Sequence, residues 1–126
     1  MEELAIKKNS PEASLGLLVS VALVDDHYSS EEKIVIYKLC DAYNYPQDKL
    51  ETLINKILEL DKSVFERCEY FINLIDEKDL KEKLIEDLGS LISSDHIVHE
   101  NEIYIYKLVA KKWGMYQSWF ISCLKL

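Results

Sequence analysis

Hydrophobic residues recur every three or four positions along most of the chain, in segments separated by short polar turns. This spacing places apolar side chains on one face of an α-helix. The pattern predicts seven helices, at 11–24, 30–43, 47–60, 62–75, 80–93, 100–113 and 116–124. The expected fold class is therefore all-α: a single-domain helical bundle over residues 1–126, with residues 1–9 as a loose arm or a short helical lead-in.

The first predicted helix differs from the others because it is apolar on nearly all sides. Between Leu15 and Val24, only Gly16 and Ser20 interrupt a run of Leu, Val and Ala. A helix without a polar face is normally buried. We therefore expect this helix at the centre of the bundle.

Several predicted helix ends carry residues that stabilise such ends. A Ser, Thr, Asp or Asn side chain before the first turn accepts a hydrogen bond from a backbone N–H of that turn. Ser29 and Glu32 match a capping box, in which each side chain bonds the backbone N–H of the other residue. The expected N-caps are Ser10, Ser29, Asp61 and Asp79, with Pro11 at the first helical position and Gly114 after the sixth helix.

One stretch of the chain occurs twice, at an offset of 70 residues. The segments 25–43 and 95–113 each open with an aspartate and carry a glutamate seven residues later, at the start of a helix. The apolar positions that follow coincide at the same offset, as do those at the end of the preceding helix. We interpret this pattern as an internal duplication with pseudo-twofold symmetry. The paired acids are Asp25 with Asp95 and Glu32 with Glu102.

Each repeated glutamate belongs to the apolar face of its helix. Glu32 precedes Ile36 by four residues, and Glu102 precedes Tyr106 by the same interval. Residues four apart share one side of a helix, so both carboxylates should face the core. Such a carboxylate must be hydrogen-bonded or neutralised, because burying an unpaired charge is costly.

Three arrangements would satisfy these carboxylates. The first is a capping box at a helix N-terminus, where the dipole favours negative charge, although His99 replaces the serine in the second copy. The second is a divalent cation, Ca²⁺ or Mg²⁺, held by oxygen ligands where the two turns converge, against the partial positive charge of the helix ends. The third is a basic group from a partner. The metal ligands in the second arrangement would be Asp25, Glu32, Asp95 and Glu102.

Two common kinds of metal site are not indicated. An EF-hand loop needs glycine at its sixth position and glutamate at its twelfth, but counting from Asp25 these positions hold Ser30 and Ile36. Zinc sites usually show CxxC or HxxxH pairs, which this sequence lacks. The histidines near the turns are expected to be ordinary turn residues or pH-sensitive groups beside the acids: His27, His96 and His99.

Charge and composition restrict the class of partner and the cellular compartment that we expect for this protein. The formal net charge of −8 opposes binding to nucleic acid, which requires Lys and Arg against phosphates. The longest nearly apolar run, 15–24, is shorter than the roughly 20 residues of a membrane span, and the N-terminal sequence has no secretory pattern. We expect a soluble, cytoplasmic protein that does not cross the membrane.

The cysteines are expected to be buried free thiols: Cys40, Cys68 and Cys123.

The two acidic segments, 25–32 and 95–102, resemble the twin Asp-Gly-x-(Ile/Val)-x-x-x-Glu elements of the TerB-like tellurite-resistance family. The resemblance extends from about Ser10 to Leu126. It implies an all-helical, internally duplicated bundle in a bacterial stress response to tellurite and other toxic insults, with links to membrane-bound partners. It also implies that Asp25, Glu32, Asp95 and Glu102 form the family's acidic element, which is suspected of binding metal. Asp26 and His96 replace the glycines of that element.

These observations favour a non-enzymatic binding or adaptor domain. The chain has no Gly-rich phosphate loop, nucleophile elbow or recognisable catalytic set, so we expect no enzymatic activity and no cofactor beyond a divalent cation. Two alternatives stay open: a small metal-dependent enzyme that uses the same carboxylates, and a structural domain whose acids only cap helices. A protein partner is expected, and a second copy of the chain is one candidate. Aromatic residues that could form the partner surface, or else pack in the core, are Tyr104, Tyr116 and Trp119.

Overall fold

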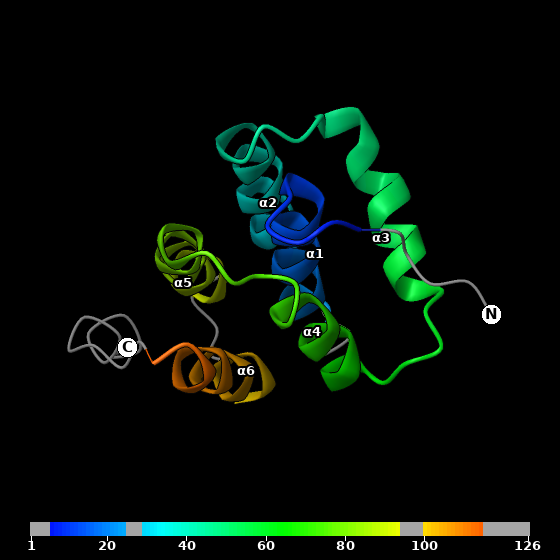
Figure 1. The fold of residues 1–126 in the computed structure, drawn as a ribbon. Coiled ribbons are helices and arrows are strands. Elements are labelled where there is room, and N and C mark those ends of the chain that lie inside the picture. Colours follow the sequence, from blue (N-terminus) through cyan, green and yellow to red (C-terminus); the bar gives the residue numbers. More distant parts are fainter. Residues whose placement is uncertain (1–5, 25–28, 94–99, 115–126) are drawn as a thin grey trace.

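The computed structural model describes residues 6–24, 29–93 and 100–114, which form an all-helical bundle (Figure 1). These residues contain six α-helices, one short 3₁₀ helix and no β-strand. The predicted all-α class is confirmed for these residues. The predicted seventh helix at 116–124 lies outside the described residues, and the predicted internal duplication stays a prediction. The helices are α1 (Pro11–Ala22), α2 (Ser30–Ala42), η1 (Gln47–Lys49), α3 (Leu50–Leu58), α4 (Val64–Ile72), α5 (Lys78–Ile92) and α6 (Glu100–Lys112).

Helix α1 lies at the centre of the bundle, as its all-round apolar sequence predicts (Figure 1). Every residue from Ala13 to Ala22 is buried, and α1 packs against each of the other α-helices. Its start is the predicted one, because Ser10 Oγ accepts a hydrogen bond of 3.1 Å from the N–H of Ala13. Helix α1 therefore forms the core around which the remaining helices are arranged.

Helix α4 approaches α1 closely at a glycine. A Cβ atom at Gly16 would lie only 2.6 Å from Cζ of Phe71, and closer still to two other carbons of that ring. The Phe71 side chain is fully buried. Gly16 is thus required for close packing between the two helices, and this explains its place in the apolar run of α1.

The N-cap of α4 is Ser63, so the prediction of Asp61 as the cap was wrong. Ser63 Oγ accepts a hydrogen bond of 3.2 Å from the N–H of Glu66, and Glu66 Oε1 accepts one of 2.8 Å from the N–H of Ser63. This capping box satisfies two backbone donors at once, whereas an aspartate alone satisfies one. The exposed Asp61 lies in the loop before the helix.

The start of α5 also differs from the prediction, because Asp79 lies in the first turn and Glu77 is the N-cap. Within the described residues, the Glu77 side chain makes no capping hydrogen bond. The backbone here is bonded by a residue distant in sequence: Asn9 Oδ1 accepts hydrogen bonds from the N–H groups of Asp76, at 2.8 Å, and Glu77, at 3.2 Å. Asn9 is therefore held against the α4–α5 connection and is not part of a loose arm, while residues 1–5 of the predicted arm lie outside the described residues.

The C-terminal end of α2 is joined to α5 by polar contacts. The Tyr43 hydroxyl donates a 2.5 Å hydrogen bond to Asp87 Oδ2. Lys83 Nζ lies 4.2 Å from the centre of the Tyr43 ring and donates a 2.7 Å hydrogen bond to the carbonyl oxygen of Ala42. These contacts fix the C-terminal end of α2 on α5.

Two of the three cysteines are buried free thiols among the described residues, as predicted: Cys40 and Cys68. Burial raises the pKa of the Cys68 thiol to about 12, which keeps it protonated near neutral pH. Cys123 lies outside the described residues. In the part of the chain that the structure describes, no helix has the length and apolarity to cross a membrane.

Candidate functional site

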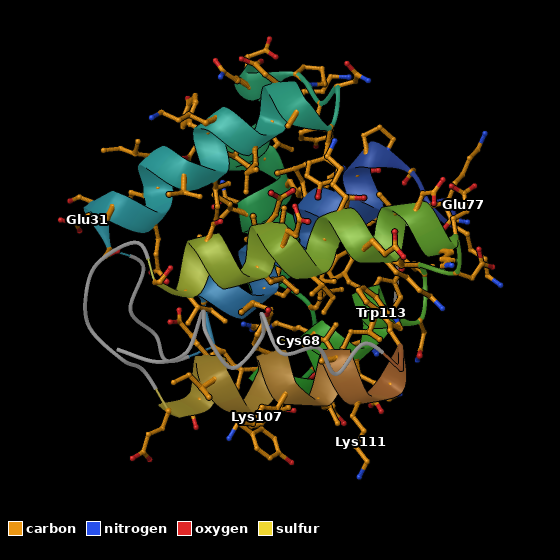
Figure 2. All side chains as sticks on the ribbon, turned by 90° about the vertical axis from the view of Figure 1, so that its left-hand side faces the viewer. Glu31, Cys68, Glu77, Lys107, Lys111 and Trp113 are labelled. Atoms are coloured by element: carbon orange, nitrogen blue, oxygen red, sulfur yellow. The ribbon has the colours of Figure 1, made fainter. Side chains whose placement is uncertain are left out.

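The candidate site is built on the first turns of α2 and α6. Figure 2 shows both turns at the same end of the molecule, with α5 ending beside them. Helices α2 and α6 have 13 residues each, and their first residues, Ser30 and Glu100, are separated by the offset of the repeated sequence. The glutamate of each copy is consequently the third residue of its helix.

Glu32 is buried, with only 1% of its surface exposed, and its predicted capping box is present. Glu32 Oε1 accepts a 3.1 Å hydrogen bond from the N–H of Ser29, and Ser29 Oγ accepts a 3.0 Å bond from the N–H of Glu32. The other carboxylate oxygen, Oε2, is also buried and accepts no hydrogen bond from residues 6–24, 29–93 or 100–114. The capping box therefore satisfies one of the two oxygens of this carboxylate.

Glu102 is fully buried at the matching position of α6. Ile105, Tyr106, Val109 and Ala110 continue the same buried side of the helix. The prediction that both glutamates face the core is thus confirmed. Two carboxylates on core-facing positions of separate helices are an unusual feature, because glutamate is rarely buried in full.

The remaining predicted ligands lie outside the described residues: Asp25, Asp95 and the histidines His27, His96 and His99. Among the residues that are described, no group of three or more His, Cys, Asp and Glu side chains is arranged to hold a metal ion. The structure therefore describes two of the four predicted metal ligands, Glu32 and Glu102. The complete four-carboxylate site stays a prediction.

Sequence reasoning missed a buried hydroxyl in α1. Ser20 is only 2% exposed, and its Oγ makes no hydrogen bond within the described part of the chain. Ser14, by contrast, donates a 3.2 Å hydrogen bond to the carbonyl oxygen of Ser10. The sequence indicated this feature through a serine within a run of otherwise apolar residues. A hydroxyl buried there loses its hydrogen bonds to water.

Comparison with known proteins identifies the family. The family model described as tellurite resistance protein TerB matches residues 11–124. The chain belongs to the TerB family. It is accordingly a tellurite-resistance-associated domain, and the family resemblance noted from the two acidic segments is confirmed.

A solved structure supports the fold of this TerB domain. The crystal structure of a protein of unknown function from Porphyromonas gingivalis W83 superimposes with a TM-score of 0.61 at 15% sequence identity. The match covers 99% of the TerB domain and 94% of the other chain. No curated protein matches the sequence. At this low identity the likeness concerns the helical fold alone.

Proposed function

We propose that this TerB domain is a non-enzymatic adaptor in a bacterial tellurite-resistance and stress-response system, and that its acidic element binds a divalent cation. The ligands in this proposal are Asp25, Glu32, Asp95 and Glu102. The element arises from an internal duplication that sets two equivalent helix starts at one end of the bundle. The equal lengths of α2 and α6 and their matching buried faces support the duplication.

The observation that carries the proposal is the buried Oε2 atom of Glu32, which accepts no hydrogen bond from the described residues. A buried carboxylate loses its hydration, and this loss is offset only by hydrogen bonds or by an opposite charge. A cation at this oxygen would supply that charge. Ca²⁺ and Mg²⁺ suit the site because both prefer carboxylate oxygens.

The helix dipoles oppose a cation and must be outweighed. Each helix start carries a partial positive charge equivalent to about half an elementary charge. Two helix starts therefore contribute roughly one positive charge, while four carboxylates contribute four negative charges. The net field at the element favours a divalent cation, and it would weaken sharply if two of the carboxylates were removed.

Isothermal titration calorimetry with Ca²⁺, Mg²⁺, Mn²⁺ and Zn²⁺ tests the proposal. The wild type should bind at least one of these ions, and the double variant Glu32→Gln/Glu102→Gln should not. Glu31 and Glu100 provide the matched control, because they lie in the same first turns but are exposed. The Glu31→Gln/Glu100→Gln variant removes the same charge and should keep the affinity within about threefold, since exposed charges act weakly through solvent.

Two results would overturn the cation proposal. The first is the absence of binding for all four ions in the wild type. The second is an equal loss of affinity in the two double variants, which would indicate diffuse attraction by an acidic surface. Circular dichroism of both variants in the absence of metal shows whether the helices are retained.

A further inference from the structure

Two aromatic side chains meet at the surface between α4 and α6. The rings of Phe65 and Tyr104 have centroids 5.7 Å apart and planes inclined at 82°, an edge-to-face contact. Phe65 is 40% exposed and Tyr104 is 59% exposed. The Phe65 ring of α4 therefore packs against Tyr104 of α6 and lies outside the buried core.

These rings line a surface groove of about 510 Å³ that combines an apolar wall with carboxylates. Helices α4 and α6, which carry the lining residues, pack against each other (Figure 1). Large exposed apolar side chains are few in the described residues, so two of them in contact in one groove form a distinct surface feature. The lining residues are Phe65, Glu66, Glu69, Asn101, Tyr104 and Leu108.

The groove carries negative charge at neutral pH. The hydrogen bond from the N–H of Ser63, assisted by the Ser63 side chain, lowers the pKa of Glu66, which therefore stays ionised. The Glu69 carboxylate lies 3.9 Å from Lys112 Nζ, but the Lys112 side chain is 37% exposed and the Glu69 side chain 57%, so solvent weakens this ion pair. A cation from outside can therefore compete with Lys112 for Glu69.

We propose that this groove binds an arginine side chain from a basic segment of a partner protein. A guanidinium group stacks on aromatic faces and pairs with carboxylates, and the groove offers both kinds of group side by side. Leu108 supplies apolar contact for the methylene groups of the arginine. The overall charge of −8 would accelerate the approach of a basic partner. This surface uses other residues than the acidic element and does not depend on the proposed cation.

The direct test is a titration of ¹⁵N-labelled protein with an acetylated and amidated peptide of sequence Gly-Arg-Leu-Arg-Gly. The control peptide carries citrulline, a neutral isostere, in place of both arginines. Saturable amide shifts centred on Phe65, Glu69 and Tyr104 are expected with the arginine peptide. The citrulline peptide should bind at least fivefold more weakly.

Matched variants locate the binding on the groove. Tyr104→Ser should lower the affinity for the arginine peptide by roughly two- to fivefold, which is the range expected for loss of an exposed cation–π contact. Glu66→Gln/Glu69→Gln should weaken it by a similar factor, and this effect should fade in high salt. Tyr37 is the matched control, because it is 44% exposed on α2 and contributes nothing to the lining of this groove. Tyr37→Ser should leave the affinity unchanged.

Three outcomes would overturn the inference. They are the absence of saturable shifts at millimolar peptide, equal affinity for the arginine and citrulline peptides, and a loss of affinity in Tyr37→Ser equal to that in Tyr104→Ser. The Glu32→Gln variant keeps every groove residue and should bind the peptide as the wild type does. Peptide binding and cation binding can therefore fail independently of each other.

Discussion

Glu32 and Glu102 occupy the same position in two helices of equal length: each is the third residue of a 13-residue helix, and each is buried. A glutamate at this position usually reaches back to cap the helix while its outer oxygen remains in water. Here both side chains face the core of the bundle. The first turns of α2 and α6 are thus the places where a change of charge should have the largest effect on this TerB domain.

Cation binding should raise the thermal stability of the protein. At a free cation concentration about 100 times Kd, the free energy of unfolding should rise by about 2.7 kcal/mol. For a chain of this size this corresponds to roughly 10 °C in Tm. Differential scanning calorimetry with and without chelator measures the shift. It should vanish in Glu32→Gln/Glu102→Gln and persist in Glu31→Gln/Glu100→Gln; a shift of equal size in both variants would contradict the assignment of the ligands.

The Gly16→Ala substitution should destabilise the protein by about 1–3 kcal/mol, because the added methyl group overlaps the buried Phe71 ring. Alanine normally stabilises a helix relative to glycine by about 0.5–1 kcal/mol, so the sign of the change separates packing from helix propensity. Urea unfolding provides the measurement.

The matched control for Gly16→Ala is the same substitution in a Phe71→Leu background. The smaller leucine leaves room for the methyl group, so the cost of Gly16→Ala should decrease by more than 0.5 kcal/mol, the level above which double-mutant coupling is significant. Additive effects of the two substitutions would contradict the proposed contact.

The Tyr43→Phe substitution should make the protein less sensitive to alkaline pH. Burial, and secondarily the hydrogen bond to Asp87, raise the pKa of Tyr43 above its ordinary value of 10.0. The unfolded phenol ionises near pH 10 while the folded one stays protonated, so the stabilisation is complete below pH 10 and declines as the pH rises above it. The wild type should therefore lose stability faster than the variant above pH 10, by up to about 1.4 kcal/mol per pH unit.

Near neutral pH, Tyr43→Phe should cost about 1–2 kcal/mol through the lost hydrogen bond to Asp87. Tyr37→Phe is the control for both measurements, because the Tyr37 side chain is exposed and one tyrosine is removed in each variant. Equal alkaline dependence of the two variants in urea unfolding would contradict the raised pKa of Tyr43. Equal stability of the two variants near neutral pH would show that the Tyr43–Asp87 hydrogen bond contributes no stability.

The capping box of α4 should make a contribution that disappears in acid. The hydrogen bonds from Ser63 lower the pKa of Glu66 from its ordinary 4.5. The stabilisation is therefore present above pH 4.5 and is lost as the pH falls through the lower, folded-state pKa. Wild type should exceed Glu66→Gln in stability at pH 7, and the difference should shrink below pH 4.5. Glu69→Gln, one turn later on the same helix, is the control, and a difference that stays constant with pH would contradict the prediction.

The helix N-termini show which features the local sequence predicts and which it does not. Ser10 and Ser29 were predicted as N-caps and act as such, because a cap involves only neighbouring backbone groups. The N-terminal end of α5 was not predictable in this way. Its backbone is bonded by Asn9, which lies 67 residues from Asp76 in the sequence, and no local pattern indicates such a partner.

The sequence by itself determined where the six helices lie within the described residues, that α1 is central, and that Glu32 and Glu102 face inward, because these properties depend on spacings of three to four residues within one helix. Only the tertiary structure decided that Phe71 packs against Gly16, that Phe65 meets Tyr104 at the surface, and that Tyr43 bonds Asp87. Each of these contacts joins residues of different helices. Their geometry depends on how the helices pack, which the hydrophobic pattern of a single helix does not specify.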